Sequence, residues 1–222
     1  MFKVENLTVY YLNKKEKHYL LNDVCFSINQ GDCLGIISKS GDGKSTLAKA
    51  LLKIYDNNVY LESGNIYLNN EELEASSRGK EISLLFQNPN SYLNPSMKVG
   101  KQIDEMLIYH FKEKKNTAKQ KAIELMEEAG INNASTIYNY YPHEISGGMQ
   151  QRISLCIALI CRPKVLILDE CTSYLDKESK LNILSLIKEL QLRHKFTLIM
   201  ISHDFKEIYS SCNKIAIMRK GK

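Results

Sequence analysis

The chain has 222 residues, of which 44% are hydrophobic and 25% are charged, so fibrous and disordered classes are excluded and a sizeable core is expected. The 30 Lys and Arg exceed the 25 Asp and Glu by a formal net charge of +5, an evenly spread excess that does not indicate nucleic acid. No apolar run approaches the ~18 residues of a membrane span, and the N-terminus lacks a secretory signal, so we expect a cytosolic protein.

The first part of the chain predicts short strands around one helix. Residues 2–9 alternate between apolar and polar, as a half-buried strand does. Residues 33–38 (CLGIIS) form a continuous apolar run, which is typical of a strand buried on both faces of a parallel sheet. A polar break is predicted at 12–18, a second strand with its turn at 21–32 and a helix at 46–55. An edge hairpin strand at 63–70 and a buried strand at 82–86 follow.

The middle of the chain predicts only helices, and the last part returns to alternation. Helices are expected at 101–111, at 117–130 with Gly130 as the stop, and at 149–162 before Pro163. Then come a buried strand at 165–170, an amphipathic helix at 180–194 and a buried strand at 196–202. A short helix at 204–212 and a final strand at 214–222 complete the prediction.

This order predicts an α/β fold with a helical insertion. We expect one unit over residues 1–222, with a nucleotide-binding core at 1–87 and 161–222 and a helical subdomain at 88–160. The six cysteines form no CxxC pair and mostly lie in apolar runs, which favours reduced core thiols. The five histidines have no metal-ligand spacing, so a structural zinc site is not expected.

A phosphate-binding loop is predicted at residues 38–46 (SKSGDGKST). The general pattern is GxxxxGK[ST] between a buried strand and a helix, and both neighbours are predicted here. Gly41 and Gly43 allow backbone N–H groups to surround phosphate oxygens, and the start of the helix adds partial positive charge. We expect Lys44 to contact the β- and γ-phosphates and Ser45 to bind Mg²⁺.

The first glycine of the pattern is replaced by Ser38, which fits there if its φ is negative. A glycine-rich strand–helix turn is the structural alternative, but it gives no reason for the Lys-Ser-Thr that follows. The candidate nucleotide-binding residues of the loop are Ser38, Lys39, Ser40, Gly41, Asp42, Gly43, Lys44, Ser45 and Thr46.

A pair of acids ends the apolar strand VLILDE, residues 165–170. Asp169 is predicted to hold the Mg²⁺ shell, and Glu170 is predicted to polarise an attacking water. Two carboxylates at a strand end suit phosphoryl transfer, because the metal neutralises one while the other stays free for the water. An exposed turn is the alternative, but it does not explain four apolar residues that lead into two acids.

Residues 145–152 (ISGGMQQR) lie between these two motifs. Ser146, Gly147 and Gly148 would open the next helix and form a second anion site from side chain, backbone N–H and helix dipole; a simple N-cap serine is the alternative. The segment resembles the signature of the ATP-binding cassette (ABC) family, usually LSGGQ followed by a Q-R pair. The resemblance covers nearly the whole chain, from Val4 to Lys220, and implies ATP and Mg²⁺ as cofactors.

Four further positions take their roles from this resemblance. Gln87 resembles the Q-loop glutamine, which senses the metal and the attacking water, and 173–176 resembles the D-loop. His203 resembles the switch histidine that contacts the γ-phosphate. Tyr11 is the candidate for the aromatic that stacks on adenine, with Tyr10 as the alternative.

Within the family, the segments FQNPNSYLNPSMKVGKQI (86–103), YPHEISGGMQQR (141–152) and LICRPKVLILDE (159–170) resemble the peptide and nickel importer group. Three departures stand out: Ser38 replaces Gly, Cys171 replaces the usual Pro, and Tyr174 replaces a small residue of the D-loop. None of them removes a predicted catalytic residue, so ATP hydrolysis is expected.

The resemblance implies the ATPase subunit of an importer for peptides or for nickel and other metal chelates. Two such subunits would enclose two ATP molecules, with Lys44 of one and Ser146 of the other on the same ATP. The implied partners are a second ABC ATPase subunit, generally a paralogue, two membrane permease subunits and an extracytoplasmic substrate-binding protein. The implied location is the cytoplasmic face of the plasma membrane, peripheral through the permease.

A soluble ABC-type ATPase that acts on DNA or ribosomes is the alternative function. Such members usually carry a long coiled-coil insertion or two cassettes in one chain, and neither is evident in these 222 residues. The diffuse charge also gives no basic patch, so no nucleic acid is expected. The cargo is chosen by other subunits, and the sequence leaves it open.

Overall fold

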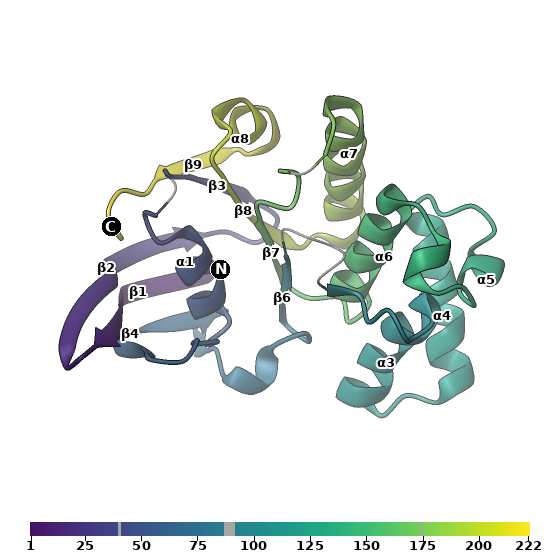
Figure 1. The fold of residues 1–222 in the computed structure, drawn as a ribbon, viewed down its shortest axis with the longest axis horizontal. Coiled ribbons are helices and arrows are strands. Elements are labelled where there is room, and N and C mark those ends of the chain that lie inside the picture. The colour runs from purple at the N-terminus through teal and green to yellow at the C-terminus, as the bar shows by residue number, and fades with distance from the viewer. Residues whose placement is uncertain (40, 87–91, 174) are drawn as a thin grey trace.

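The computed structural model describes residues 1–39, 41–86, 92–173 and 175–222. Over these residues the chain forms two sheets and a group of helices at one side (Figure 1). The first sheet is antiparallel, with the order β2-β1-β4-β5. Its strands are β1 (Phe2–Asn13), β2 (Glu16–Ile28), β4 (Val59–Leu68) and β5 (Glu71–Glu72).

The β1–β2 hairpin is longer than predicted. Residues 12–18, expected as a polar break, are strand on both sides of a tight turn at Lys14 and Lys15, which both have positive φ. The prediction was wrong because residues 13–19 are exposed in the hairpin tip, where polar side chains fit while the backbone stays paired. The predicted hairpin strand at 63–70 lies within β4 and its turn to β5.

The second sheet is parallel throughout, with the order β6-β7-β8-β3-β9. The predicted α/β fold with a parallel core and an N-terminal antiparallel part is therefore confirmed. All residues of β7 and β8 are buried, as their continuous apolar sequences predict. The strands are β3 (Cys33–Ile37), β6 (Ile82–Leu85), β7 (Val165–Asp169), β8 (Thr197–Ser202) and β9 (Lys214–Ile217).

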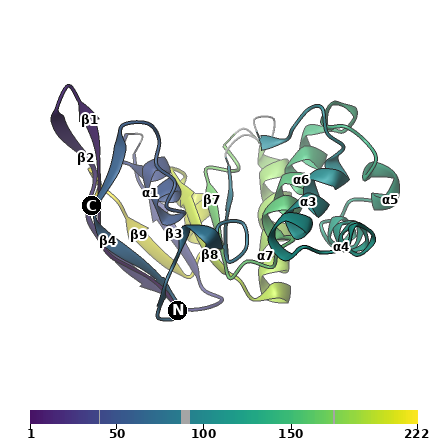
Figure 2. The same ribbon diagram turned by 90° about the horizontal axis from the view of Figure 1, so that it is seen from below.

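Two hydrophobic cores lie on the two faces of the parallel sheet. Because side chains alternate along a strand, Val165 and Ile167 belong to one core, and Leu166 and Leu168 belong to the other. The first core joins the parallel sheet to the antiparallel sheet through α1 (Lys44–Leu51), which lies between them (Figure 2). Helix α1 begins two residues before the predicted start, so that Lys44, Ser45 and Thr46 of the predicted phosphate loop form its first turn.

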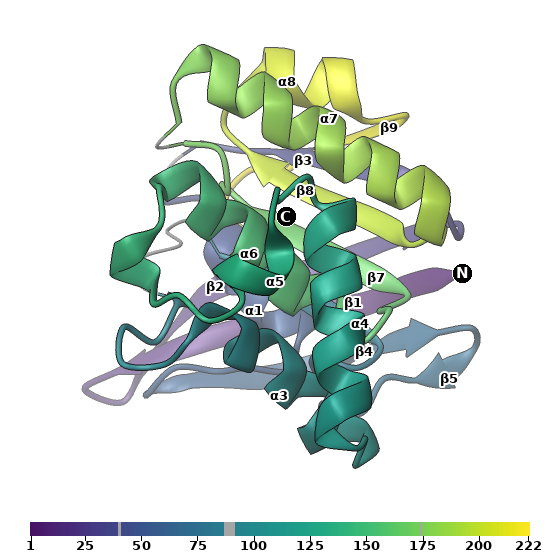
Figure 3. The same cartoon turned by 90° about the vertical axis from the view of Figure 1, so that its right-hand side faces the viewer.

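Helices cover the other face of the parallel sheet. Figure 3 shows α7 and α8 lying across it, and Figures 1 and 2 show α3 to α6 gathered at the side away from the antiparallel sheet. Among the described residues, the helices lack the combination of length and apolar sequence that a membrane span requires. The helices are α3 (Val99–Phe111), α4 (Lys115–Glu128), α5 (Ala134–Ile137), α6 (Gly147–Leu159), α7 (Lys177–His194) and α8 (Phe205–Ser211), with 3-10 turns at Ala75–Ser77 and Pro142–Glu144.

Helix α3 is packed very closely against Tyr138. A Cβ placed on Gly100 would lie 1.9 Å from the nearest ring carbon of Tyr138, so no larger residue fits without displacing the ring. The ring is 1% exposed, and its hydroxyl donates a hydrogen bond to the buried carboxylate of Asp104. This contact fixes α3 against the segment that leads into α6.

Candidate functional site

The predicted phosphate loop connects β3 to α1. Lys44 is buried, and its Nζ donates to the carbonyl oxygens of Ser38 at 3.1 Å and Lys39 at 3.0 Å. Gly41 is exposed and has a φ of 87°, and a Cβ placed on it would meet nothing within 4 Å, so glycine is favoured there by the backbone conformation and not by lack of space. Ser38 is not among the described residues with a positive φ, which explains why this position does not require glycine. The predicted Ser40 lies outside the described residues.

The loop is held from outside by the β1–β2 hairpin. Gly43 has a φ of 98°, and a Cβ on it would lie 2.6 Å from the carbonyl oxygen of Leu20. Leu20 protrudes because the register shifts there, with Val9 opposite Leu21 and Tyr10 opposite Tyr19. Glycine is therefore required at position 43 for both its backbone conformation and its space.

The same hairpin carries the two tyrosines considered for adenine. Strand alternation puts Tyr11 on the face of β1 that buries Val9, and Tyr10 on the opposite face, where it stacks on Tyr60 with centroids 5.6 Å apart. Tyr11 stacks on His18, with ring centroids 4.8 Å apart and planes 17° apart. Tyr11 stays the prediction, and His18 is a ring beside it that the sequence did not single out.

The buried end of β7 presents Asp169 beside the start of α1. Asp169 is 9% exposed, and its Oδ1 has no hydrogen-bond partner among the described residues. Burial raises the pKa of this carboxyl group, and a hydrogen bond from Ser45 partly opposes the rise. A hydroxyl next to an unsatisfied carboxylate oxygen is a hard-oxygen set that fits Mg²⁺.

Glu170 brings the loop and the end of β8 together. Its Oε1 lies 3.4 Å from Nζ of Lys44 and 3.3 Å from Nδ1 of His203. The residue has a φ of 48°, an uncommon conformation for a side chain larger than glycine, and its N–H donates to the carbonyl oxygen of Ile201 at 2.9 Å. Lys44, Glu170 and His203, predicted from three separate motifs, thus meet at one place.

Cys171, which follows the pair of acids, is part of the interior. It is 5% exposed, and burial raises the pKa of its thiol to about 12, so the group is a neutral thiol at ordinary pH. Its carbonyl oxygen accepts a hydrogen bond of 2.8 Å from Nε2 of Gln151 in α6. This bond joins the signature helix to the loop that follows Glu170.

The signature residues open α6. Ser146 is the N-cap, and its Oγ accepts a hydrogen bond from the N–H of Met149 at 3.3 Å. Gly147 and Gly148 are exposed helical residues at which a Cβ would meet nothing within 4 Å. Packing among residues 1–39, 41–86, 92–173 and 175–222 therefore does not require glycine at either position.

The signature and the phosphate loop do not come together within one chain. Figures 1 and 2 both show α1 on one side of β6 and β7 and α6 on the other. Helix α6 also begins two residues earlier than predicted, since Gly147 and Gly148 are helical.

In the D-loop, Asp176 is the N-cap of α7. Its Oδ1 accepts hydrogen bonds of 3.0 Å from the N–H of Glu178 and from that of Ser179. Gln87 and Tyr174 lie outside the described residues.

The role of Asp42 was not evident from the sequence. Its carboxylate accepts hydrogen bonds from the N–H of Lys39 at 3.1 Å and of Lys220 at 3.0 Å. The bond from Lys220, followed by that from Lys39, lowers the pKa of Asp42. A cavity of about 490 Å³ adjoins this contact. It is lined by Ile37, Ser38, Lys39, Asp42, His203 and the segment Ile217–Lys220. The presence of an acidic residue inside a phosphate loop could have indicated a structural role for Asp42. Its partner Lys220, however, lies 178 residues away in the sequence.

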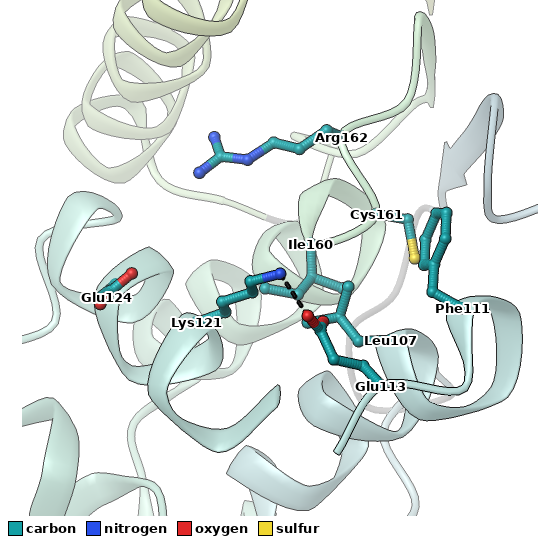
Figure 4. Close-up of a pocket in the computed structure, with 8 residues that line it drawn as sticks. All are labelled: Leu107, Phe111, Glu113, Lys121, Glu124, Ile160, Cys161 and Arg162. Atoms are coloured by element: carbon teal, nitrogen blue, oxygen red, sulfur yellow. Dashed lines mark hydrogen bonds and ion pairs between the residues drawn. The ribbon is translucent and has the colours of Figure 1, made fainter. Parts of the chain in front are cut away.

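A second cavity, of about 410 Å³, lies among the helices (Figure 4). Figure 4 shows Glu113 and Lys121 facing each other, joined by an ion pair, with Phe111 beside Cys161. None of the residues predicted for the nucleotide site lines it. Its lining residues are Leu107, Phe111, Glu113, Lys121, Glu124, Ile160, Cys161 and Arg162.

Comparison with known proteins gave one family and many relatives. Residues 21–173 match the model of the family described as ABC transporter. The oligopeptide transport ATP-binding proteins AppD and OppD of Bacillus subtilis (strain 168) are 35% and 37% identical over 100% of this chain, which spans 70% and 64% of their lengths. The dipeptide transport ATP-binding protein DppD of Escherichia coli (strain K12) is 32% identical over 100% of this chain and 70% of its own length.

Solved structures give the same result. The ATP-binding cassette MJ0796, in a dimeric post-hydrolysis state bound to ADP and Pi, superposes with a TM-score of 0.84 at 26% identity, covering 100% of this chain and 95% of that one. The cbiO1 protein from Clostridium perfringens, part of the ABC transporter complex cbiONQ, superposes with a TM-score of 0.82 at 25% identity, covering 99% and 85%.

Proposed function

This chain belongs to the ABC transporter family as an ATP-binding, ATP-hydrolysing subunit, and from this premise we propose that it drives the import of peptides through a membrane permease. The relatives named for oligopeptide and dipeptide transport, matched over the whole chain, support peptides rather than nickel or metal chelates. The same names support transport over action on DNA or ribosomes. The observation that carries ATP hydrolysis is the meeting of Lys44, Glu170 and His203 at one edge of the parallel sheet.

Binding of ATP would use the phosphate loop as it stands. Lys44 already lies inside the loop, held by the carbonyl oxygens of Ser38 and Lys39, so its ammonium group is oriented before the nucleotide arrives. The β- and γ-phosphates would take the backbone N–H groups around Gly41 and Gly43 and the start of α1. Tyr11 would stack on the adenine ring.

Ser45 and Asp169 would hold Mg²⁺ through the serine hydroxyl and the unsatisfied Oδ1. When bound, Mg²⁺ supplies positive charge to the oxygens of the β- and γ-phosphates. The raised pKa of Asp169 shows that burial opposes its charged form, and a cation would reverse this effect. Gln87 would complete this set.

Hydrolysis would rest on Glu170. Its carboxylate would accept the proton of the attacking water, and His203 would contact the γ-phosphate. Oε1 of Glu170 lies near both Lys44 and His203, so these groups share one site. The phosphate would replace Glu170 as the anion beside the ammonium group of Lys44 and leave Glu170 for the water.

A second ATPase subunit would supply the missing contact to the γ-phosphate through its Ser146, Gly147 and Gly148. The exposed glycines support this reading, because no packing in the described part of the chain requires them. The further proposed partners are two permease subunits and an extracytoplasmic binding protein, with the chain at the cytoplasmic face of the plasma membrane. We also propose that the chain divides into a nucleotide-binding core (1–87, 161–222) and a helical subdomain (88–160). The helical subdomain would transmit the motion of the ATPase to the permease.

Purification from native membranes tests this proposal. The chain should co-purify with a second ATPase and two membrane subunits, and the complex in liposomes should hydrolyse ATP faster when a peptide-loaded binding protein is added. The same binding protein loaded with nickel should give no increase. Co-purification with ribosomes or DNA, without membrane subunits, would overturn the proposal.

A further inference from the structure

A buried carboxylate lies directly behind the proposed catalytic residues. Glu207 is in the first turn of α8 and is 6% exposed. Its Oε1 accepts a hydrogen bond of 2.6 Å from the hydroxyl of Thr172, and its Oε2 accepts one of 3.0 Å from the hydroxyl of Ser202. Both hydroxyl-bearing residues are themselves buried, at 2% and 3% exposed.

The two hydrogen-bond partners of Glu207 lie next to proposed catalytic residues in the sequence. Thr172 lies two residues after Glu170, and Ser202 is the last residue of β8, immediately before His203. One oxygen of the carboxylate therefore accepts a side-chain hydrogen bond from the segment that carries the proposed general base. The other oxygen accepts one from the segment that carries the proposed switch histidine. These segments also meet through the pairing of β7 with β8, the Glu170 N–H bond to Ile201 and the 3.3 Å contact between Glu170 and His203.

A lysine side chain forms an ion pair with Glu207. Nζ of Lys180, in α7, lies 2.9 Å from Oε2 of Glu207 and 2.8 Å from Oδ2 of Asp204. Asp204 in turn is the N-cap of α8, and its own N–H donates to Oγ of Ser202 at 3.0 Å. The carboxylate is thus fully satisfied and held in one orientation, as a buried charge must be to persist.

We propose that Glu207 is a positioning residue for ATP hydrolysis, which sets Glu170 and His203 at their working separation through Thr172 and Ser202. This inference rests on the proposed function. Rates of hydrolysis depend steeply on the placement of the base and of the group on the γ-phosphate, whereas binding of the nucleotide depends on the loop at residues 38–46 and α1. Loss of the Glu207 bonds should therefore reduce kcat and leave ATP affinity nearly unchanged.

The test compares two variants of Thr172 in the complex purified from membranes. Thr172→Val keeps the shape of the side chain but removes the hydroxyl, and we expect kcat to fall about 10- to 100-fold, with the Kd for ATP within about twofold of wild type. Thr172→Ser retains the hydroxyl and should keep kcat within about threefold of wild type. A role in stability alone would lower the melting temperature without this split between kcat and Kd.

Tyr138→Phe is the matched control. It also removes a buried hydroxyl that donates to a buried carboxylate, that of Asp104, but among the helices away from the site. It should lower the melting temperature and leave kcat unchanged. Wild-type hydrolysis with unchanged kcat in Thr172→Val would overturn the positioning role alone, whereas a wild-type complex that does not hydrolyse ATP would overturn the proposed function and this inference with it.

Discussion

Replacing Glu170 by glutamine separates ATP binding from hydrolysis. The change keeps the size of the side chain and one carbonyl oxygen, but removes the negative charge near Lys44 and His203. Lys44, Ser45 and Asp169 are untouched, so ATP should still bind. A glutamine cannot accept the proton of the attacking water, so hydrolysis should slow sharply.

The expected magnitudes follow from these contacts. Loss of a general base costs ~10²–10⁴-fold in rate, or about 3–5 kcal/mol. If the wild type turns over at the median ~10 s⁻¹, the variant would keep each ATP for about 10–1000 s. The ion pair between Lys44 and Glu170 competes with phosphate for the ammonium group, so ATP affinity should not fall in the variant.

Size-exclusion chromatography of Glu170→Gln with its cognate partner checks this reasoning. A pair of ATPases should form in buffer with ATP and dissociate in buffer with ADP, which lacks the γ-phosphate. Glu113→Gln is a suitable control, because Glu113 is equally buried (20% exposed, against 19% for Glu170) and ion-paired, but among the helices. Identical elution in ATP and ADP, or wild-type turnover by Glu170→Gln, would show that Glu170 is not the catalytic carboxylate.

Three other outcomes are expected. Lys44→Ala should reduce ATP hydrolysis by several orders of magnitude, measured as phosphate release, and near-normal turnover would refute the phosphate loop. Gly100→Ala should force the Tyr138 ring away from Asp104 and cost about 3 kcal/mol, seen as a melting temperature lower by about 6–12 °C; an unchanged melting temperature would contradict the packing. The Asp42 carboxylate has a pKa below its ordinary 3.8, so its stabilisation is present above that pH and is lost as pH falls through the folded value. The melting temperatures of wild type and Asp42→Asn should therefore differ near neutral pH and converge below about pH 3.8, and a constant difference would refute the assignment.

The parts of the fold that sequence predicts well are those governed by local patterns. The run at 33–38 predicted a doubly buried strand, and β3 is that strand, since Cys33 lies in the core on one face of the sheet and Leu34 and Ile36 lie in the core on the other. The hairpin tip was missed because its strands are stabilised by backbone pairing, which leaves no trace in the polarity of residues 13–19.

The parts of the candidate site that sequence missed depend on contacts between distant segments. The phosphate loop, the acidic pair and His203 were predicted separately, and their convergence follows from the order of the parallel strands. The bond between Asp42 and Lys220 spans 178 residues, and the Glu207 network joins three segments. No periodicity within one element encodes such pairs.

The strand order also determines when the site can exist during synthesis. The phosphate loop begins at β3, whose only sheet neighbours among the described residues are β8 and β9. Cys33 pairs with Leu198, about 165 residues later, so a ribosome adding ~5–20 residues per second would need roughly 10–30 s to deliver the partner.

Until then the nascent chain can close its antiparallel sheet, because β1, β2 and β4 all lie within the first 68 residues. During this interval the apolar strand β3 has no partner on either edge. Unpaired apolar strands of this kind favour aggregation. Chaperone dependence should therefore concentrate in the interval between the emergence of β3 and that of β8.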